Sequence, residues 1–270
     1  MIRLRRAFVT GRNAKRNAFL LLFSVAFFLA SWLVANVSIG EAVNWVSAMF
    51  IVIIAAPSYY YLVRWAGVKK GVAVIVVLGI LPVIVEAIGI STGLPYGGFY
   101  YTDMMGLKIF DLVPWSVAFA FGPLVLGTMS LAILASKDWR VMLPLSALLL
   151  VFVDLVLDPA AVVLNIWVWL EPGPYYGIPI TNYTGWFVTA LAASAILHII
   201  LSGTTKEVAE IPVEIAGSLL ISVSFWTGYS FWTGLWIPVV IGILMIAGTL
   251  YVILASDVEM IPLSEVSART

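Results

Sequence analysis

Three acidic residues lie inside long apolar stretches of the sequence, where an ionisable side chain is rarely found without a role. Glu86 lies in one stretch, and Asp154 and Asp158 lie in another. A charged residue at the centre of a membrane span costs about 2.5–3.5 kcal/mol on insertion scales. Because Asp154 and Asp158 are spaced i and i+4, they would share one helix face, and two carboxylates that close cannot both ionise easily. At least one is expected to keep its proton and to be available as a general acid.

The same apolar stretch has further polar features. Asn165 continues the polar stripe beyond the two aspartates, and Pro159 removes a helical hydrogen-bond donor and frees a carbonyl. In the alternative, structural interpretation, each acid pairs with a Tyr, Trp or Asn across the bundle and holds helices together. Three acids at a similar depth, with no cation predicted near them, favour a functional role.

Two long loops rich in Gly, Pro and aromatic residues follow the two acid-bearing stretches, at residues 92–111 and 165–186. Gly and Pro favour tight turns, and Tyr and Trp clustered at the depth of the acids predict a preorganised apolar pocket with a few polar tips. Aromatic faces also stabilise cations. The candidate substrate contacts are Tyr96, Tyr100, Tyr101, Asp103, Trp115, Asn165, Trp167, Trp169, Tyr175, Tyr176, Asn182 and Trp186.

The elements that position these residues are predicted to be membrane-spanning helices. Of the 270 residues, 63% are hydrophobic and only 10% are charged, whereas about a quarter are charged in an ordinary soluble domain. Apolar runs near the length that spans a bilayer, about 20 residues, lie at 18–38, 43–63, 71–92, 113–135, 141–164, 183–203, 214–231 and 235–255. We predict a single all-α bundle of eight spans over residues 18–255, with seven spans as the alternative. A basic segment, 1–17, precedes it and a short polar tail, 256–270, follows it.

The positions of the cations predict the orientation of this bundle. Lys and Arg are retained on the cytoplasmic side of a membrane, and eight spans place thirteen of the fourteen cations on one side, with Lys108 as the exception. This distribution predicts a multi-pass protein of the cell membrane with both termini in the cytoplasm. Arg5-Arg6 could indicate a secretion signal, but the run that follows has full span length and no evident cleavage pattern.

Composition excludes several classes of function. Fourteen basic residues balance fourteen acidic ones, so nucleic-acid binding is disfavoured. With no cysteine and only His198 as histidine, thiolate or histidine-rich metal sites are excluded or nearly so, and we predict neither metal nor cofactor. His198 is interpreted as a packed or interfacial side chain. The last two spans lack the lysine of a retinal-binding rhodopsin, and no second Asp-rich motif supports an intramembrane prenyltransferase.

Five short motifs, in their order and spacing, make the chain resemble a known family. They are Glu86 with 93–102, the Val-Pro-Trp at 113–115, 154–160, the Trp-Val-Trp at 167–169, and 173–182 with Gly185-Trp186. Over roughly residues 80–190 the chain is similar to the carotenoid-biosynthesis family of polytopic membrane proteins, which includes carotenoid hydratases. The resemblance implies an enzyme that adds water across a terminal isoprenoid double bond of an acyclic carotenoid, a bacterioruberin-type precursor, and leaves a tertiary alcohol. It implies carotenoid, water and the lipid bilayer as partners, with other carotenoid-biosynthesis membrane enzymes as candidates.

The acidic residues independently fit this chemistry. Hydration of a trisubstituted alkene begins with protonation of the less substituted carbon and ends with capture of a tertiary cation by water. Asp158 or Asp154 would supply the proton, while Glu86 or the other aspartate orients the water and takes its proton. Two other classes remain open. A proton-coupled carrier would also use intramembrane acids and broken helices, and a non-catalytic carotenoid-binding subunit would keep the aromatic loops but tolerate loss of the carboxylates.

Overall fold

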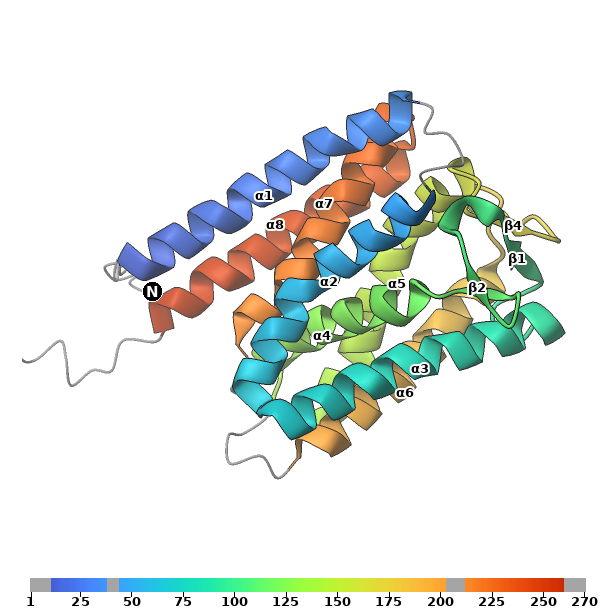
Figure 1. Cartoon of the computed structure of the whole chain (residues 1–270). Helices are drawn as coiled ribbons and strands as arrows, with labels where there is room; N and C mark the ends of the chain where they lie inside the picture. Colours follow the sequence, from blue (N-terminus) through green and yellow to red (C-terminus); the bar gives the residue numbers. More distant parts are fainter. Residues whose placement is uncertain (1–10, 38–43, 203–211, 260–270) are drawn as a thin grey trace, which may run out of the picture.

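The structure, a computed structural model, describes residues 11–37, 44–202 and 212–259, and these ranges form a bundle of eight α-helices (Figure 1). The predicted all-α bundle is therefore confirmed. The helices are α1 (Gly11–Asn36), α2 (Asn44–Ala66), α3 (Val68–Thr92), α4 (Val117–Ala135), α5 (Trp139–Val163), α6 (Ile180–Leu201), α7 (Gly217–Trp232) and α8 (Trp236–Glu259). The shorter elements are β1 (Phe99–Tyr101), η2 (Asp103–Met105), β2 (Lys108–Ile109), β3 (Val113–Pro114), β4 (Trp167–Trp169) and η4 (Val213–Ala216).

Seven helices of the described chain are long and apolar enough to cross a membrane, and α7 is the exception. Its 16 residues extend about 24 Å, less than the roughly 30 Å of a bilayer core. The 3₁₀ turn η4 runs directly into α7, so the two together cover most of that distance. The predicted choice between seven and eight spans thus depends on this helix.

The helix α1 begins and α8 ends at the same end of the bundle (Figure 1). Eight helices with alternating direction require this arrangement. The side of the membrane that this end faces stays a prediction. The helices extend further than predicted, because α1 begins at Gly11 and α8 ends at Glu259. Residues 1–10 of the basic segment and 260–270 of the polar tail lie outside the described residues.

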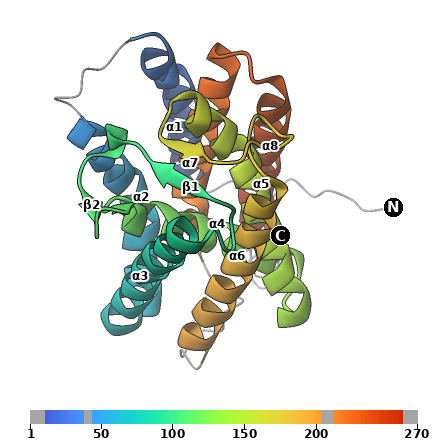
Figure 2. The same cartoon turned by 90° about the vertical axis from the view of Figure 1, so that its right-hand side faces the viewer.

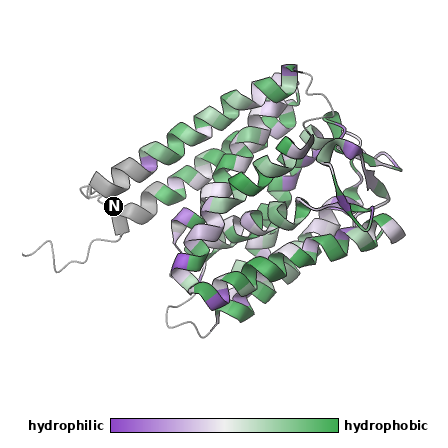
Figure 3. Ribbon diagram, in the orientation of Figure 1, coloured by the Kyte–Doolittle hydropathy of each residue, from purple (hydrophilic) through white to green (hydrophobic). Residues whose placement is uncertain are grey.

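The bundle is built around α4, which packs against α2, α3, α5 and α7. On one side α1 and α8 pack on α7, and on the other α6 packs on α5 and α3 (Figures 1 and 2). Hydrophobic residues predominate along the helices (Figure 3), and many large ones are exposed. On α3, for example, Val76, Ile80, Ile84 and Ile88 each leave about half of their surface exposed. The i, i+4 spacing of these residues marks a face that suits lipid, and Glu86 is buried on the opposite side.

The two aromatic loops meet at one end of the bundle and pair with each other (Figure 1). The helix α3 ends where Gly93 adopts a left-handed conformation, with φ of 79° and its N–H bonded to the carbonyl of Gly89. The chain then forms β1, which pairs antiparallel with β4 so that Tyr101 lies opposite Trp167. Side chains alternate in direction along a strand, so this register directs Phe99 and Tyr101 to one face and Tyr100 to the other.

Tyr175, in the second aromatic loop, supports the acid-bearing helix α5 directly. Pro159 has no N–H, so the carbonyl of Leu155 loses its helical donor. The hydroxyl of Tyr175 donates to that carbonyl at 2.9 Å. The predicted weakening of the helix next to Asp158 is therefore offset by a side chain of the loop that follows.

Candidate active site

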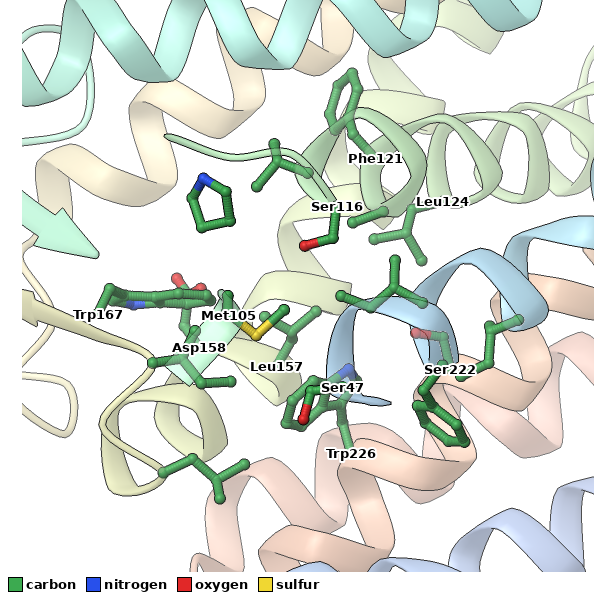
Figure 4. A pocket seen from close by; sticks show the side chains of 18 of the residues that line it. Ser47, Met105, Ser116, Phe121, Leu124, Leu157, Asp158, Trp167, Ser222 and Trp226 are labelled. Carbon is green, nitrogen blue, oxygen red and sulfur yellow. The ribbon is translucent and has the colours of Figure 1, made fainter. Parts of the chain in front are cut away.

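A cavity of about 650 Å³ lies at the loop-bearing end of the bundle, lined by residues of the helices α1 to α7 and of the paired loops (Figure 4). Its volume falls within the range of roughly 300–1,000 Å³ that is usual for small-molecule sites. The wall is predominantly apolar, but Glu86, Asp154 and Asp158 all line it. Three carboxyl groups from two helices therefore face one hydrophobic space.

Glu86 is fixed by a tyrosine of strand β1. It is only 3% exposed, and the Tyr101 hydroxyl donates to its Oε2 at 2.7 Å. Lys108 donates to the carbonyl of Tyr101 at 2.8 Å and to Asp103 Oδ1 at 2.8 Å, which holds the strand in place. Burial raises the pKa of Tyr101 well above its ordinary value, and the neighbouring Glu86 charge adds to this effect. The phenol therefore stays protonated and remains a hydrogen-bond donor.

The two aspartates of α5 share one cavity face, as their spacing predicted, but their surroundings differ. Asp158 accepts a hydrogen bond from the side-chain amide of Asn182 on α6, and both residues are buried. Asp154 is also buried, yet its Oδ2 has no hydrogen-bond partner among the described residues. A buried polar atom without a partner is rare in native proteins and indicates a place for water or ligand. Asp154 Oδ2 is thus a place on the cavity wall where a water molecule or a ligand could form a hydrogen bond.

Other polar atoms of the cavity wall also lack partners within the described chain. They are the indole N–H groups of Trp167 and Trp169 and the hydroxyl of Ser116, which is fully buried. Because buried water usually makes about three hydrogen bonds, a site with several such atoms and a carboxyl oxygen is suited to hold a water molecule.

Aromatic rings form the wall around the acids. The ring centroids of Tyr101 and Trp167 are 5.8 Å apart in an edge-to-face arrangement, and those of Phe99 and Trp169 are 5.1 Å apart. Such contacts between rings are favourable and keep each ring in one orientation. The ring faces are negatively polarised, so a cation formed near them would be stabilised.

Tyr96 anchors the first loop between the helices. Its hydroxyl lies 3.0 Å from Thr189 Oγ1, its carbonyl accepts from Thr181 at 3.1 Å, and its ring lies 4.8 Å from that of Trp186. Burial raises the pKa of Tyr96 above its ordinary value. This close fit requires a glycine on α6, because a Cβ at Gly185 would come within 2.7 Å of the Tyr96 ring.

The predicted site residues divide into two groups. Those that line the cavity are Glu86, Asp154, Asp158, Tyr96, Tyr101, Trp167, Trp169, Asn182 and Trp186. Those outside its wall are Tyr100, Asp103, Trp115, Asn165, Tyr175 and Tyr176. Tyr100 is 47% exposed on the other face of β1, Asp103 pairs with Lys108, and Tyr175 supports α5.

Asn165 does not continue the stripe of Asp154 and Asp158, as its spacing had suggested. The helix α5 ends at Val163, and Asn165 has a left-handed conformation with φ of 58°. Its carbonyl accepts a hydrogen bond from Thr102 Oγ1 at 2.6 Å. The helical spacing fails here because the chain has already turned into the loop, and the residue joins the two loops instead.

Sequence reasoning missed several cavity residues. Ser116 directly follows the Val-Pro-Trp motif, which could have drawn attention to it. Nothing marked the cavity residues of α1 and α2, because they lie in long, largely apolar runs without an acidic side chain. Within residues 11–37, 44–202 and 212–259, no cluster of three or more histidine or acidic side chains has the arrangement of a metal site, so we assign no metal ligands there.

Comparison with known proteins gives one family and one curated relative. Residues 43–249 match the family described as "Carotenoid biosynthesis protein". A "Bisanhydrobacterioruberin hydratase" from Haloarcula japonica is 31% identical over 175 residues, which cover 62% of this chain and 58% of the relative. The chain thus aligns with somewhat more than half of that relative's length. No solved structure matches the chain. Since the matched residues 43–249 make up most of the chain, the protein belongs to the carotenoid-biosynthesis family.

Proposed function

We propose that this protein is a carotenoid hydratase, which adds water across a terminal isoprenoid double bond of an acyclic carotenoid. The observation that carries the proposal is the unpartnered Oδ2 of Asp154, which is buried and lines an apolar cavity together with Asp158 and Glu86. The name of the Haloarcula japonica relative, "Bisanhydrobacterioruberin hydratase", supports the same reaction class.

In the proposed reaction, the Asp154 carboxylic acid donates its proton to the less substituted carbon of the double bond. The π bond breaks, a C–H bond forms and the adjacent carbon becomes a tertiary cation. A water molecule then forms a C–O bond to that carbon and loses a proton to Asp158. Transfer of this proton back to Asp154, one helical turn away, restores the enzyme, so the net change is alkene plus water to tertiary alcohol. General acid and base groups of this kind typically contribute about 10²–10⁴-fold each.

The surrounding residues have supporting roles in this proposal. Asn182 holds Asp158 in position, Tyr101 holds Glu86, and Glu86 orients the water together with Ser116. The rings of Trp167 and Trp169 shield the cation, which such faces stabilise by about 0.5–2 kcal/mol. The apolar wall also limits the number of water molecules that reach the cation.

A purely structural role for the acids is the main competing interpretation. The Asp158–Asn182 pair joins two helices and the Glu86–Tyr101 pair joins a helix to a loop, as such a role requires. Asp154 does not fit it, because one of its oxygens has no partner in the described chain. A non-catalytic carotenoid-binding subunit would leave that buried oxygen without a use.

The deciding experiment compares Asp154→Asn with the wild type in cells that accumulate an acyclic carotenoid. Chromatography and mass spectrometry should detect a pigment heavier by the mass of one water per hydrated end with the wild type. With Asp154→Asn, the unhydrated pigment should accumulate while the protein is still present in the membrane. Asp111→Asn is the matched control, since it removes an acid of the loops that does not line the cavity.

The outcomes separate the competing classes. Hydration that survives Asp154→Asn would overturn the assignment of the acid. If the wild type binds pigment but never hydrates it, across several acyclic substrates, the protein is a binding subunit. A carrier would instead leave every pigment unchanged and would not retain it.

A further inference from the structure

The helices α1 and α2 each present an apolar face to the cavity. The cavity is lined by Ala30, Leu33 and Val34 on α1 and by Val37 directly after its end, with the i, i+3, i+4, i+7 spacing of a single helix face. In the described chain α1 packs along α7, whereas α2 packs against α3, α4 and α7. The part of the cavity between α1 and α2 is therefore an apolar slot.

The facing wall on α2 has the same pattern. Ser47, Phe50, Ile51 and Ile54 line the cavity, again spaced i, i+3, i+4, i+7. One end of the slot is closed by three rings, because the centroid of Phe50 lies 5.5 Å from that of Phe27 on α1 and 5.2 Å from that of Phe225 on α7. Leu33 on the other wall is 55% exposed, so the slot opens toward the lipid side of the bundle.

The slot is continuous with the acid-bearing end of the cavity. In Figure 4, Asp158 and Trp167 lie on one side, Ser222 lies on the other, and Leu157 and Ser47 lie between them. Elsewhere around the cavity, β1 pairs with β4 and residues of α4, α5 and α6 belong to the packed core. A rod-like molecule with one end at the carboxyl groups can therefore extend along the apolar part of the cavity between α1 and α2.

We infer that the slot between α1 and α2 binds the polyene chain of the substrate while its terminal double bond lies at the acids. The inference rests on the proposed function, which supplies a long, rigid, apolar molecule that reacts at its end. Because the slot opens to lipid, the substrate reaches the acids sideways from the bilayer and never crosses water. The slot thus determines which chain can be bound, and the acids determine what happens to its end.

Filling the slot tests this inference. Ser47→Trp and Ala30→Trp place a large side chain in the slot, and Met49→Trp and Leu29→Trp are matched controls. The controls lie on the same helices at 41% and 55% exposure and do not line the cavity. Each variant is purified and assayed with a full-length acyclic carotenoid and with a short isoprenoid alkene that carries the same end group.

We expect Ser47→Trp and Ala30→Trp to lower kcat/KM for the carotenoid by about tenfold or more, because an overfilled site excludes its ligand. The short alkene should change by less than about twofold, and the controls should behave as the wild type with both substrates. The amount of carotenoid retained per purified protein should fall in parallel. A graded series, Ser47→Val and Ser47→Leu, should give intermediate losses and guards against misfolding of the tryptophan variants.

Several results would overturn the inference. Equal losses of kcat/KM with the long and the short substrate would show that the substitutions disturb the acids. No loss of kcat/KM with either substrate would show that the slot does not bind the substrate. Variants that lose bound phospholipid but convert carotenoid normally would show that the slot holds an acyl chain. If the wild type hydrates neither substrate, the proposed function is wrong. The amount of pigment retained by each variant then tests whether the slot binds a polyene. Less pigment on Ser47→Trp than on Met49→Trp supports the slot, and equal amounts refute it.

Discussion

The two ends of the cavity are built in different ways. At the acid end, residues from separate elements are joined by directed hydrogen bonds, such as Tyr101 to Glu86 and Asn182 to Asp158. At the slot end, apolar faces of α1 and α2 stand apart, and the contacts between them that the structure describes are ring contacts such as Phe27 with Phe50. Proton transfer requires an atom held within hydrogen-bond reach, whereas binding a polyene requires only an apolar space of suitable width. The difference indicates that the acid end carries out the reaction and that the slot end binds the substrate chain.

The largest expected effect separates the two ends directly. Asp158→Asn should reduce hydration of both a long and a short substrate by about 10²–10⁴-fold, because the group that receives the proton from water is lost. Pigment retention should stay at the wild-type level, since the slot is untouched. Turnover and retained pigment are measured on the same purified sample. Loss of pigment together with turnover would mean that the two ends cannot be separated.

A smaller effect is expected from the support of Glu86. Tyr101→Phe removes the hydroxyl that donates to Glu86 at 2.7 Å, and a buried acceptor without its donor costs about 1–3 kcal/mol. We expect a lower Tm in detergent and a lower kcat, with KM for the carotenoid nearly unchanged. Tyr100→Phe, on the exposed face of the same strand, is the control. An unchanged Tm and kcat in Tyr101→Phe would show that this hydrogen bond does not position Glu86.

The close packing of the first loop gives the next prediction. A Cβ at Gly185 would lie 2.7 Å from the Tyr96 ring and 2.8 Å from the carbonyl of Pro95, so Gly185→Ala should destabilise the protein by about 1–3 kcal/mol. Gly248→Ala, in a helix with nothing within 4 Å of the added atom, should be neutral or stabilising by up to about 1 kcal/mol. Thermal unfolding followed by circular dichroism measures both, and equal shifts would contradict the tight fit of Tyr96.

The smallest effect is expected at the rim of the acid end. Asp103 pairs with Lys108 at 2.8 Å, but its side chain is 96% exposed, and exposed ion pairs contribute little. Asp103→Asn should leave Tm, turnover and pigment retention within experimental error of the wild type. Lys108→Met should have the larger effect of the two, because Lys108 also donates to the carbonyl of Tyr101. A large loss of turnover in Asp103→Asn would contradict this prediction and would assign Asp103 a role in the reaction.

Much of the site could be predicted from sequence because rare polar residues stand out in an apolar chain. The i, i+4 spacing brought Asp154 and Asp158 onto one face, and both line the cavity. The same periodicity misplaced Asn165, since spacing alone does not reveal where a helix ends. The spacing of the loop aromatics also did not reveal which of them face the cavity. The register of β1 against β4 decides this, because it directs Tyr101 and not Tyr100 toward Glu86.

The sequence by itself determined the helical membrane bundle, the family and the three acids, because hydrophobic run length and buried charge are local properties of the chain. The tertiary structure alone decided which carboxyl oxygen lacks a partner, that of Asp154, since this depends on Asn182 and Tyr101 arriving from other elements. It alone revealed the slot as well. Helices α1 and α2 have apolar faces like any packed helix, and only their separation in space leaves room for a ligand between them.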